Sequence, residues 1–304
     1  MLAQCDGPSI TISTSADANS ISTCQLYDGD VIIDSSASGS ISLDGVGKIS
    51  GDFRATNITQ LTALSADQLS EIGGVFELEE LIIMSSLSFP SLTAVNQIRL
   101  ISLPSLQALG FTAGVSRANQ VYISNTQLTD LSGIALEAVG TVDVNNNPYL
   151  TKVNMPLTNI TNSLSLSANG LNLEIDLPNL ANVANLTIRN ASSLSVPLLS
   201  EVEASFAIYA ASFSSFDAPT LATVGASLAI VDTEASSLSF SSIQTIGGGL
   251  LLSNNTNLNT ISFPELRTIV GDMVLAGNFD SSVIFLCRQR SFKLKCCIVS
   301  ASIL

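Results

Sequence analysis

Three carboxylates come nearest, by residue type and spacing, to a catalytic pair. Glu77 and Glu79 lie two residues apart in an alternating run, and Asp143 stands in the middle of a later run. Retaining glycoside hydrolases use two carboxylates about 5 Å apart, so a β-helical polysaccharide-active enzyme is one alternative. The chain has no histidine and no tryptophan, and therefore lacks the usual general base near neutral pH and the best aromatic platform for sugars. We expect no catalytic residue, no cofactor and no metal site.

Five asparagines stand in Asn-x-Ser/Thr sequons, the acceptor motif for N-linked glycans. They are Asn57, Asn159, Asn185, Asn190 and Asn254. Asn57, Asn190 and Asn254 each follow the start of a short apolar-x-apolar run by four residues, a column that Asn125 and Asn146 share without the sequon. A buried asparagine ladder is the alternative for this column, but a buried side chain cannot carry a glycan. We therefore expect an exposed corner, with three glycans on one ridge.

The five cysteines lie near the two ends of the chain. Cys5 and Cys24 flank Ile10-Thr11-Ile12, and Cys287, Cys296 and Cys297 come last. The early pair suggests a disulfide that closes the N-terminal end of the core, and two buried free thiols are the alternative. Because the total is odd, at least one thiol has no partner within the chain.

The composition favours a secreted β-protein. Of 304 residues 46% are hydrophobic, yet only 12% are charged, against about 25% in a typical soluble protein. The net charge of −14 argues against nucleic acid, which needs a basic surface. No apolar run reaches the ~18–20 residues that cross a bilayer. Met1–Gln4 is too short for a secretory signal, so for a secreted protein we expect the signal to be missing from this sequence.

Short apolar-x-apolar runs recur through nearly the whole chain with a spacing of 20–23 residues. They begin at Ile10, Val31, Phe53, Phe76, Ile98, Val121, Val142, Leu164, Leu186, Phe206, Leu228, Leu250 and Met273. The alternation within each run is that of a strand, and the period lies in the range of leucine-rich-repeat-like coils. The pattern predicts a mainly β, right-handed parallel β-solenoid of about thirteen coils of ~22 residues.

Three domains are expected: an N-terminal cap over residues 1–30, the solenoid over 31–280 and a non-repeat basic tail over 281–304. Leu61–Gly74 predicts a short helix, and Gly110–Gln120 a loop. From Ser281 the sequence has no acidic residue and four of the eleven basic ones. We expect this tail to be disordered or aberrant, and a poor cap for the last coil.

The outward face of the main sheet is expected to differ between its two halves. Its first half reads Arg54, Glu77, Arg99, Tyr122 and Asp143, and the alternating charge is best interpreted as a solvated face with favourable cross-strand pairs. The second half is apolar and predicts a contact surface, unless the tail or a further segment covers it. Its residues are Ala207, Tyr209, Ala229, Val231, Leu251, Val274 and Ala276.

The repeat phrases VGASLAIVDT, LTIRNASSLSVPLLSEV and IGGGLLLSNNTNLNTISFPELRTIVGDMVLAGN resemble the receptor L-domain repeat. More narrowly, they resemble the fungal GPI-anchored cell-wall organisation proteins of the Ecm and Sps type, whose mature part begins like Cys5…Cys24 followed by Gly29-Asp30-Val31. The resemblance covers about residues 5–280. It implies a secreted, N-glycosylated protein of the cell wall or the outer face of the plasma membrane. That family also has a signal peptide and a Ser/Thr-rich stalk with a hydrophobic tail, which Ile298–Leu304 does not supply.

These observations favour a non-catalytic cell-surface glycoprotein that contributes to wall organisation and integrity. A receptor-like ligand-binding L-domain module is the first alternative, and the polysaccharide-active enzyme is the second. Expected partners are cell-wall polysaccharide or wall proteins, with possible self-association and no nucleic acid. Membrane contact is expected only through the GPI anchor that the resemblance implies.

Overall fold

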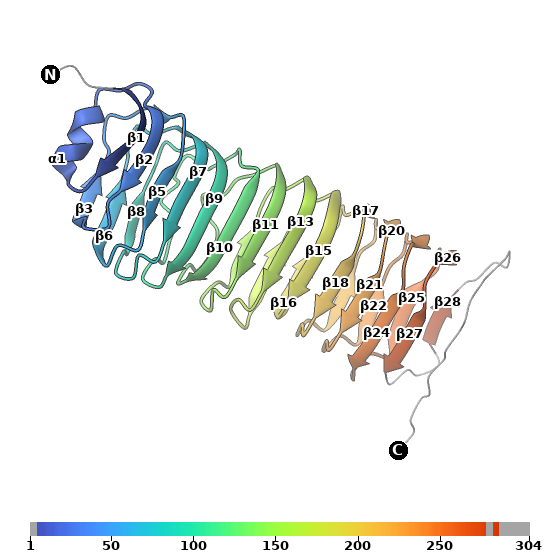
Figure 1. Cartoon of the computed structure of the whole chain (residues 1–304). Coiled ribbons are helices and arrows are strands. Elements are labelled where there is room, and N and C mark those ends of the chain that lie inside the picture. Colours follow the sequence, from blue (N-terminus) through green and yellow to red (C-terminus); the bar gives the residue numbers. More distant parts are fainter. Residues whose placement is uncertain (1–4, 278–281, 286–304) are drawn as a thin grey trace. The chain divides into compact units, whose positions relative to one another are not determined.

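The computed structural model describes residues 5–277 and 282–285. The chain divides into two compact units, Met1–Met155 and Pro156–Leu304. Within each unit, one strand of a large parallel sheet alternates with shorter strands on the return side of the coil (Figure 1).

The first unit stacks its main strands in chain order, with β4 (Lys48–Ile49) beside β7. The main strands are β1 (Asp6–Ile12), β2 (Asp28–Ile33), β5 (Phe53–Thr56), β7 (Glu71–Glu79), β9 (Ala94–Leu103), β10 (Gln120–Thr126) and β11 (Ala138–Asn145). The return strands β3 (Ser38–Ser42), β6 (Gln60–Ser65) and β8 (Ser86–Ser88) form a three-stranded parallel sheet, and β12 (Lys152–Asn154) follows later in the chain.

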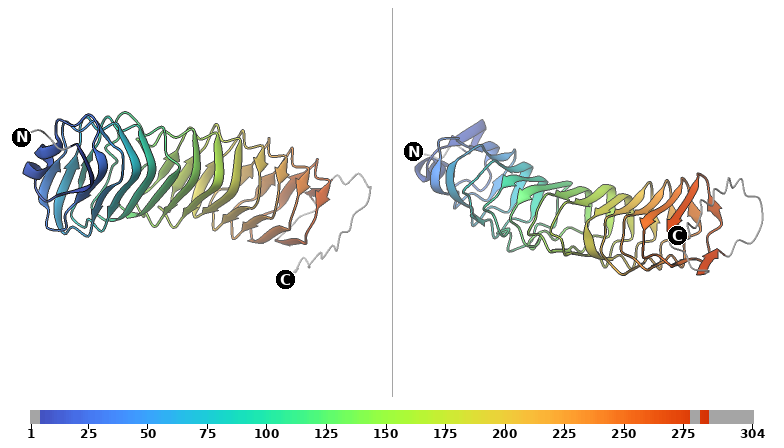
Figure 2. Two further views of the ribbon diagram at one scale, coloured as in Figure 1. Left: turned by 45° about the horizontal axis from the view of Figure 1, so that its top comes forward. Right: turned by 90° about the horizontal axis from the view of Figure 1, so that it is seen from below.

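The second unit repeats the arrangement, and its main strands become shorter after β15 (Figure 2). Its main strands are β13 (Asn159–Ser167), β15 (Asn182–Arg189), β18 (Phe206–Tyr209), β21 (Leu228–Val231), β24 (Leu250–Asn255) and β27 (Met273–Gly277). Two-residue strands precede the later ones: β17 (Glu201–Val202), β20 (Thr223–Val224), β23 (Thr245–Ile246) and β26 (Thr268–Ile269). The return strands are β14 (Leu173–Asp176), β16 (Ala191–Ser195), β19 (Ser215–Asp217), β22 (Ser237–Ser239), β25 (Thr260–Phe263) and β28 (Ser282–Phe285).

Strand register confirms the predicted parallel solenoid. Phe53 pairs with Phe76 and then Ile98, and Phe206 pairs with Leu228 and then Leu250. The run-starting residues from Val31 to Leu250 are buried, whereas Ile10 and Met273, in the first and last main strands described, are half-buried. A parallel ladder places equivalent residues of successive coils next to one another. Apolar residues that recur at a nearly constant spacing therefore stack into a continuous core.

Aromatic rings fill the interior of each unit. Phe76 contacts three rings in the first unit, with centroid distances of 5.4 Å to Phe53, 5.0 Å to Phe89 and 5.9 Å to Phe111. In the second unit the rings of Phe240 and Phe263 stack with centroids 5.0 Å apart. Phe89 belongs to the same coil as Phe76, but the contacts of Phe76 with Phe53 and Phe111 and the Phe240–Phe263 stack join successive coils, in addition to the backbone ladder.

The corners of the ten main strands from β5 to β24 each have one residue in the left-handed region, with φ between 51° and 61°. These residues are Asn57, Glu80, Ser102, Asn125, Asn146, Ala168, Asn190, Ala210, Asp232 and Asn254. All of them lie four positions after the first inward residue of their coil. Asparagine and aspartate tolerate this conformation better than other non-glycine residues, which explains why asparagine recurs in the column.

A second asparagine column, one residue further along, is buried. Asn147 and Asn255 are fully buried. The Oδ1 atom of Asn255 accepts hydrogen bonds from the backbone nitrogen of Thr233 at 2.9 Å and from its Oγ1 at 2.7 Å, and Nδ2 donates to the carbonyl of Ile230. Asn147 binds the backbone nitrogen and the hydroxyl of Thr126 in the same way. The buried asparagines therefore lie one position after the column of Asn57, Asn190 and Asn254, for which a buried ladder was the alternative.

The N-terminal segment contains a helix, α1 (Ser15–Ala18), followed by a 3-10 turn, Asn19–Ile21. Thr14 caps α1 through its side chain, and Asp17 completes the capping box. The helix predicted within Leu61–Gly74 is wrong, because this stretch contains β6 and the start of β7. Pairing of β6 with β3 and β8 outweighs the local helix propensity.

Two findings concern the predicted tail and the membrane. Residues 282–285 were expected to lie outside the repeat, but β28 pairs with β25 in parallel register, so the return sheet continues past residue 281. The rest of the tail, including Cys287, Cys296 and Cys297, lies outside the described residues. Among the described residues, no helix has the length and apolar character needed to cross a membrane.

Candidate functional surfaces

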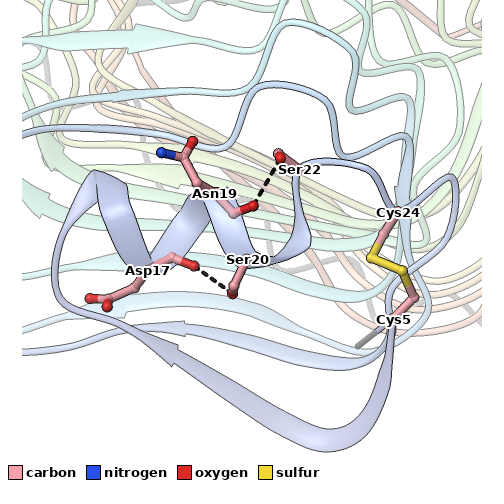
Figure 3. The surroundings of a disulfide bond; sticks show 6 residues. All are labelled: Cys5, Asp17, Asn19, Ser20, Ser22 and Cys24. Atoms are coloured by element: carbon pink, nitrogen blue, oxygen red, sulfur yellow. Dashed lines mark hydrogen bonds between the residues drawn. A yellow bond between two sulfur atoms is a disulfide. The ribbon is translucent and has the colours of Figure 1, made fainter. Parts of the chain in front are cut away.

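Cys5 and Cys24 form a disulfide with an S–S distance of 2.00 Å and a Cα–Cα distance of 5.5 Å. It joins the start of β1 to the segment that follows α1 (Figure 3). Ala18, Ile21 and Cys24 are buried, so this segment covers one end of the first coil. A disulfide of this kind is typical of a chain that folds in an oxidising compartment.

The candidate catalytic carboxylates are held by arginines. Glu77 is only 8% exposed. It forms one ion pair with Arg54 Nη1 and another with Arg99 Nε at 2.8 Å. Arg99 also reaches Glu79 through Nη2 at 3.2 Å. Both glutamates therefore serve a charge ladder across β5, β7 and β9.

Asp143 lies too far from the glutamates to complete a pair. Register places Tyr122 beside Arg99 on one side and beside Asp143 on the other, so Glu77 and Asp143 are three strand spacings apart, or about 14 Å. Asp143 instead accepts a hydrogen bond from Asn145 Nδ2 at 3.0 Å. This separation exceeds that of both retaining and inverting glycosidases.

An aspartate ladder that the sequence analysis did not identify supports these arginines. Asp30 accepts a hydrogen bond from the backbone nitrogen of Asp52 at 2.8 Å, and Asp52 accepts one from Val75 at 2.7 Å. Asp52 also pairs with Arg54 Nη2 at 2.6 Å. Gly51 leaves room for the ladder, because a Cβ there would lie 2.1 Å from Asp30 Oδ1. The repeated Gly-Asp pair was the available sequence signal.

We expect the ladder to make the stability of the first unit depend on pH. Partial burial acts to raise the pKa of Asp52, but hydrogen bonds from Val75 and Arg54 and the charge of Arg54 outweigh it and lower the pKa below its usual value. The hydrogen bond and charge of Lys48 similarly lower the pKa of Glu71. A lowered carboxyl pKa adds stability above the unfolded-state pKa, and this stability is lost as pH falls through the folded-state pKa.

We therefore expect the urea midpoint of the first unit to fall between pH 7 and about pH 3. Asp52→Asn should lower stability at pH 7 and flatten the pH dependence. Part of the dependence will remain, because the pKa values of Glu71, Asp17 and Asp34 are also lowered. Equal changes in midpoint for the variant and the parent would contradict the role given to Asp52.

The sequons lie in two kinds of place. Asn57, Asn190 and Asn254 are exposed at left-handed corners. The two others belong to the main sheet of the second unit, where Asn159 is half-buried in β13 and Asn185 is exposed in β15. Asn185 Nδ2 donates to the carbonyl of Asn162 at 3.2 Å, and Asn254 Nδ2 donates to Asp232 Oδ1 at 2.8 Å.

Peptide mapping of protein from a fungal host should find glycans at the three corner asparagines. Exposure and a strongly bent backbone give the corner amides access that half-buried Asn159 lacks. Asn125 and Asn146 share the corner conformation without the sequon and should stay unmodified, which makes them internal controls. Unmodified corner peptides alongside a glycan at Asn159 would contradict this prediction.

The apolar positions of the second unit lie next to one another in the ladder. Ala207 pairs with Ala229, then Leu251 and then Val274, and Tyr209 pairs with Val231. Ala276 follows two residues after Val274 in β27. Ala207 and Ala229 are each 9% exposed, whereas Val274 is 38% exposed. Arg189 Cζ lies 4.0 Å from the centroid of the Tyr209 ring, a cation–π contact at the edge of this surface.

A pocket in the first unit is lined by Asp130, Leu131, Ser132, Lys152 and Asn154. Its one carboxylate, Asp130, accepts a hydrogen bond from the backbone of Ser132. No three Cys, Asp or Glu side chains within the described part of the chain gather in a way that fits a metal ion.

The fold and the sequons together define the class of protein: a disulfide-capped parallel β-solenoid whose exposed corners carry glycan acceptors. Comparison with known proteins gives the family. The chain is 38% identical over 205 residues to protein ecm33 of Aspergillus fumigatus, and 39% identical over 205 residues to a cell surface GPI-anchored protein of Arthroderma benhamiae. It is 31% identical over 229 residues to cell wall protein ecm33 of Schizosaccharomyces pombe. The chain belongs to this Ecm33- and Sps-type family of fungal cell-surface proteins.

Each of these three matches covers 67% of this chain and 52–54% of the relative. The chain thus spans about half the length of the curated relatives it matches. No family model matches the chain, and no solved structure matches it.

Proposed function

We propose that this chain belongs to a non-catalytic, N-glycosylated cell-surface protein that contributes to the organisation and integrity of the fungal cell wall. The observation that carries the proposal is its kinship, over 67% of its length, with proteins named for the cell wall and the cell surface. Attachment to the membrane would follow from a GPI anchor of the kind named in these relatives.

The geometry of the first unit supports a structural role over catalysis. Its closely spaced carboxylates, Glu77 and Glu79, bind arginines, and Asp143 is too distant to act with them. The disulfide and the exposed sequons fit a protein that matures in the secretory pathway. Wall polysaccharide, other wall proteins or a second copy of the chain are the partners that such a surface would meet.

Complementation tests the proposal. The full chain, fused to a secretion leader and a GPI signal, is expressed in a fungal strain that lacks its own Ecm33-type protein. We expect it to restore resistance to a wall-perturbing dye. Failure to restore resistance, at a surface abundance equal to that of the strain's own protein, would refute the proposed function.

A matched variant separates structure from catalysis. Glu79→Gln combined with Asp143→Asn removes both partners that Glu77 would need for acid–base chemistry, but leaves the buried Glu77 and its arginines in place. We expect this variant to restore resistance as well as the parent chain. Loss of rescue by a folded, correctly exposed variant would favour the enzyme instead.

A further inference from the structure

Two adjacent isoleucines are exposed beside the first corner sequon, that of Asn57. Ile82 is 54% exposed and Ile83 is 42% exposed. The other large hydrophobic side chains exposed in the described part of the first unit, Leu26 and Tyr149, stand singly. Scattered apolar residues are ordinary on a protein surface, whereas contiguous ones favour contact with another group. We call Ile82 and Ile83 the isoleucine pair.

Strand register places the isoleucine pair next to this sequon. On the two sides of the corner, β5 pairs with β7 and β6 pairs with β8 at the same offset along the chain. Thr59, which completes the sequon, therefore lies beside Ile82, and Gln60 lies beside Ile83. Both polar neighbours are exposed. Two residues along the chain and one strand spacing separate the Cα atoms of Asn57 and Ile82, which makes roughly 8 Å.

The second unit shows a similar juxtaposition at Asn190. Leu173 pairs with Ala191, so Asn190 lies beside the loop that leads into Leu173. The backbone nitrogen of Leu173 donates to the carbonyl of Gly170 at 3.1 Å, which closes a turn with Leu171 at its tip. Leu171 is 86% exposed, the largest value among the exposed large hydrophobic side chains of the described residues. Two of the three corner sequons thus have a strongly exposed apolar side chain in a neighbouring coil.

The chemistry of an N-linked glycan suits these neighbours. Its first two sugars are N-acetylglucosamines, each with a face of C–H groups, an acetyl methyl group and hydroxyls at the edge. Such a face removes apolar surface from water when it lies on an isoleucine or leucine, while the edge hydroxyls stay hydrated. Because the glycan is covalently attached, the contact forms at a high effective concentration and costs little loss of translational freedom.

We propose that the glycan at Asn57 packs on Ile82 and Ile83, and that the glycan at Asn190 packs on Leu171. The corner glycans then shield the apolar side chains of neighbouring coils and form part of the packed surface. This inference rests on the N-glycosylation in the proposed function and specifies what the glycans contact.

The arrangement favours the chain's own glycan over a protein partner. Two partly exposed isoleucines supply far less than the ~800 Å² that each partner buries in a stable interface. A glycan is bulky and polar, and one attached at Asn57 would stand about one strand spacing and two residues from the isoleucine pair. Any protein that approached the pair would have to displace this glycan.

Digestion of the native glycoprotein tests the contact. Endoglycosidase H must grasp the two core sugars of a fungal high-mannose glycan and cleave between them, so a packed core is cleaved slowly. The full chain from a fungal host is digested without denaturant, and peptide mass follows each site with time. Ile82→Ser combined with Ile83→Ser should speed cleavage at Asn57 by about fivefold or more. The rate at Asn254, in the other unit, should not change.

Leu26→Ser is the matched control for the isoleucine variant. Leu26 is 47% exposed in the same unit, but it precedes β2 and so lies at the opposite end of a main strand from the corners. Its replacement should leave the rate at every site unchanged. In the second unit, Leu171→Ser should speed cleavage at Asn190 by a similar factor and leave Asn57 as it is.

Dye binding gives a second readout that needs no glycosidase. Thr59→Ala removes the sequon and should increase the fluorescence of a hydrophobic dye such as anilinonaphthalene sulfonate, because the isoleucine pair becomes uncovered. Adding Ile82→Ser and Ile83→Ser to this variant should return the fluorescence to the parent value. Equal fluorescence of the parent and the Thr59→Ala variant would contradict the shielding.

The remaining outcomes are equally decisive. An unchanged cleavage rate at Asn57 or at Asn190 overturns the proposal for that site, and so does a parent chain without a glycan there. If the serine variant unfolds by circular dichroism, Ile82→Thr with Ile83→Thr replaces it, because threonine keeps the branched shape; an unchanged rate again overturns the proposal. A parent chain that restores dye resistance while its cleavage rates match those of the variants refutes this inference alone and leaves the proposed function intact.

Discussion

Replacing Phe76 by alanine should lower the free energy of unfolding of the first unit by about 3–5 kcal/mol. The side chain is fully buried, and its ring contacts Phe53, Phe89 and Phe111. The contacts with Phe53 and Phe111 join neighbouring coils, so the cavity would loosen the stack on both sides of β7. Urea unfolding followed by circular dichroism measures the loss, and secreted yield from a fungal host should fall with it.

Ile83→Ala is the matched control, because Ile83 belongs to the same coil but is 42% exposed. Its effect should stay within about 0.5 kcal/mol, as for most surface substitutions. A similar loss of stability in the two variants would mean that the aromatic contacts do not hold the coils together.

Replacing Asn255 by alanine should lower the free energy of unfolding of the second unit by about 2–4 kcal/mol. Its side chain is the partner of two buried backbone groups, the nitrogen of Thr233 and the carbonyl of Ile230. Leaving a buried polar group without a partner costs about 1–3 kcal/mol. The substitution keeps the Asn254-x-Thr256 sequon, so the glycan predicted at Asn254 should remain.

The neighbouring Asn254→Gly variant should show the reverse behaviour. Glycine adopts the left-handed φ of 57° without strain, so stability should change little while the sequon is lost. Unfolding curves and intact mass measured on both variants separate the two asparagines. A glycan lost in Asn255→Ala, or a large destabilisation in Asn254→Gly, would reverse the roles assigned to them.

This pair of residues also shows where the sequence reaches its limit. Alternation within a strand puts the first and third residues of each run inward, and continued alternation would turn the fifth, Asn254, inward as well. The left-handed backbone conformation at that residue interrupts the alternation. Asn254 is therefore exposed and Asn255 buried, and only the dihedral angle decides between two adjacent asparagines.

The predicted helix within Leu61–Gly74 failed for a related reason. Its local sequence favours a helix, but β6 gains ladder hydrogen bonds from strands on either side, and these come from segments more than twenty residues away. The residues of the stretch alone do not indicate that these hydrogen bonds will form. The aspartate ladder through Asp30 and Asp52 was similarly hidden, because its acceptors and donors lie in different coils.

The sequence by itself determined the solenoid, its register and the outward columns of the main sheet. A parallel ladder turns a spacing of 20–23 residues into stacked positions, so the one-dimensional pattern already contained the pairing of Arg54 with Glu77 and of Ala229 with Leu251. The sequons already indicated exposed corners, but the tertiary structure alone decided their left-handed geometry, the buried Thr–Asn pairs and the arginine contacts that hold Glu77. These depend on dihedral angles and on side-chain contacts between coils, and a repeat period specifies neither.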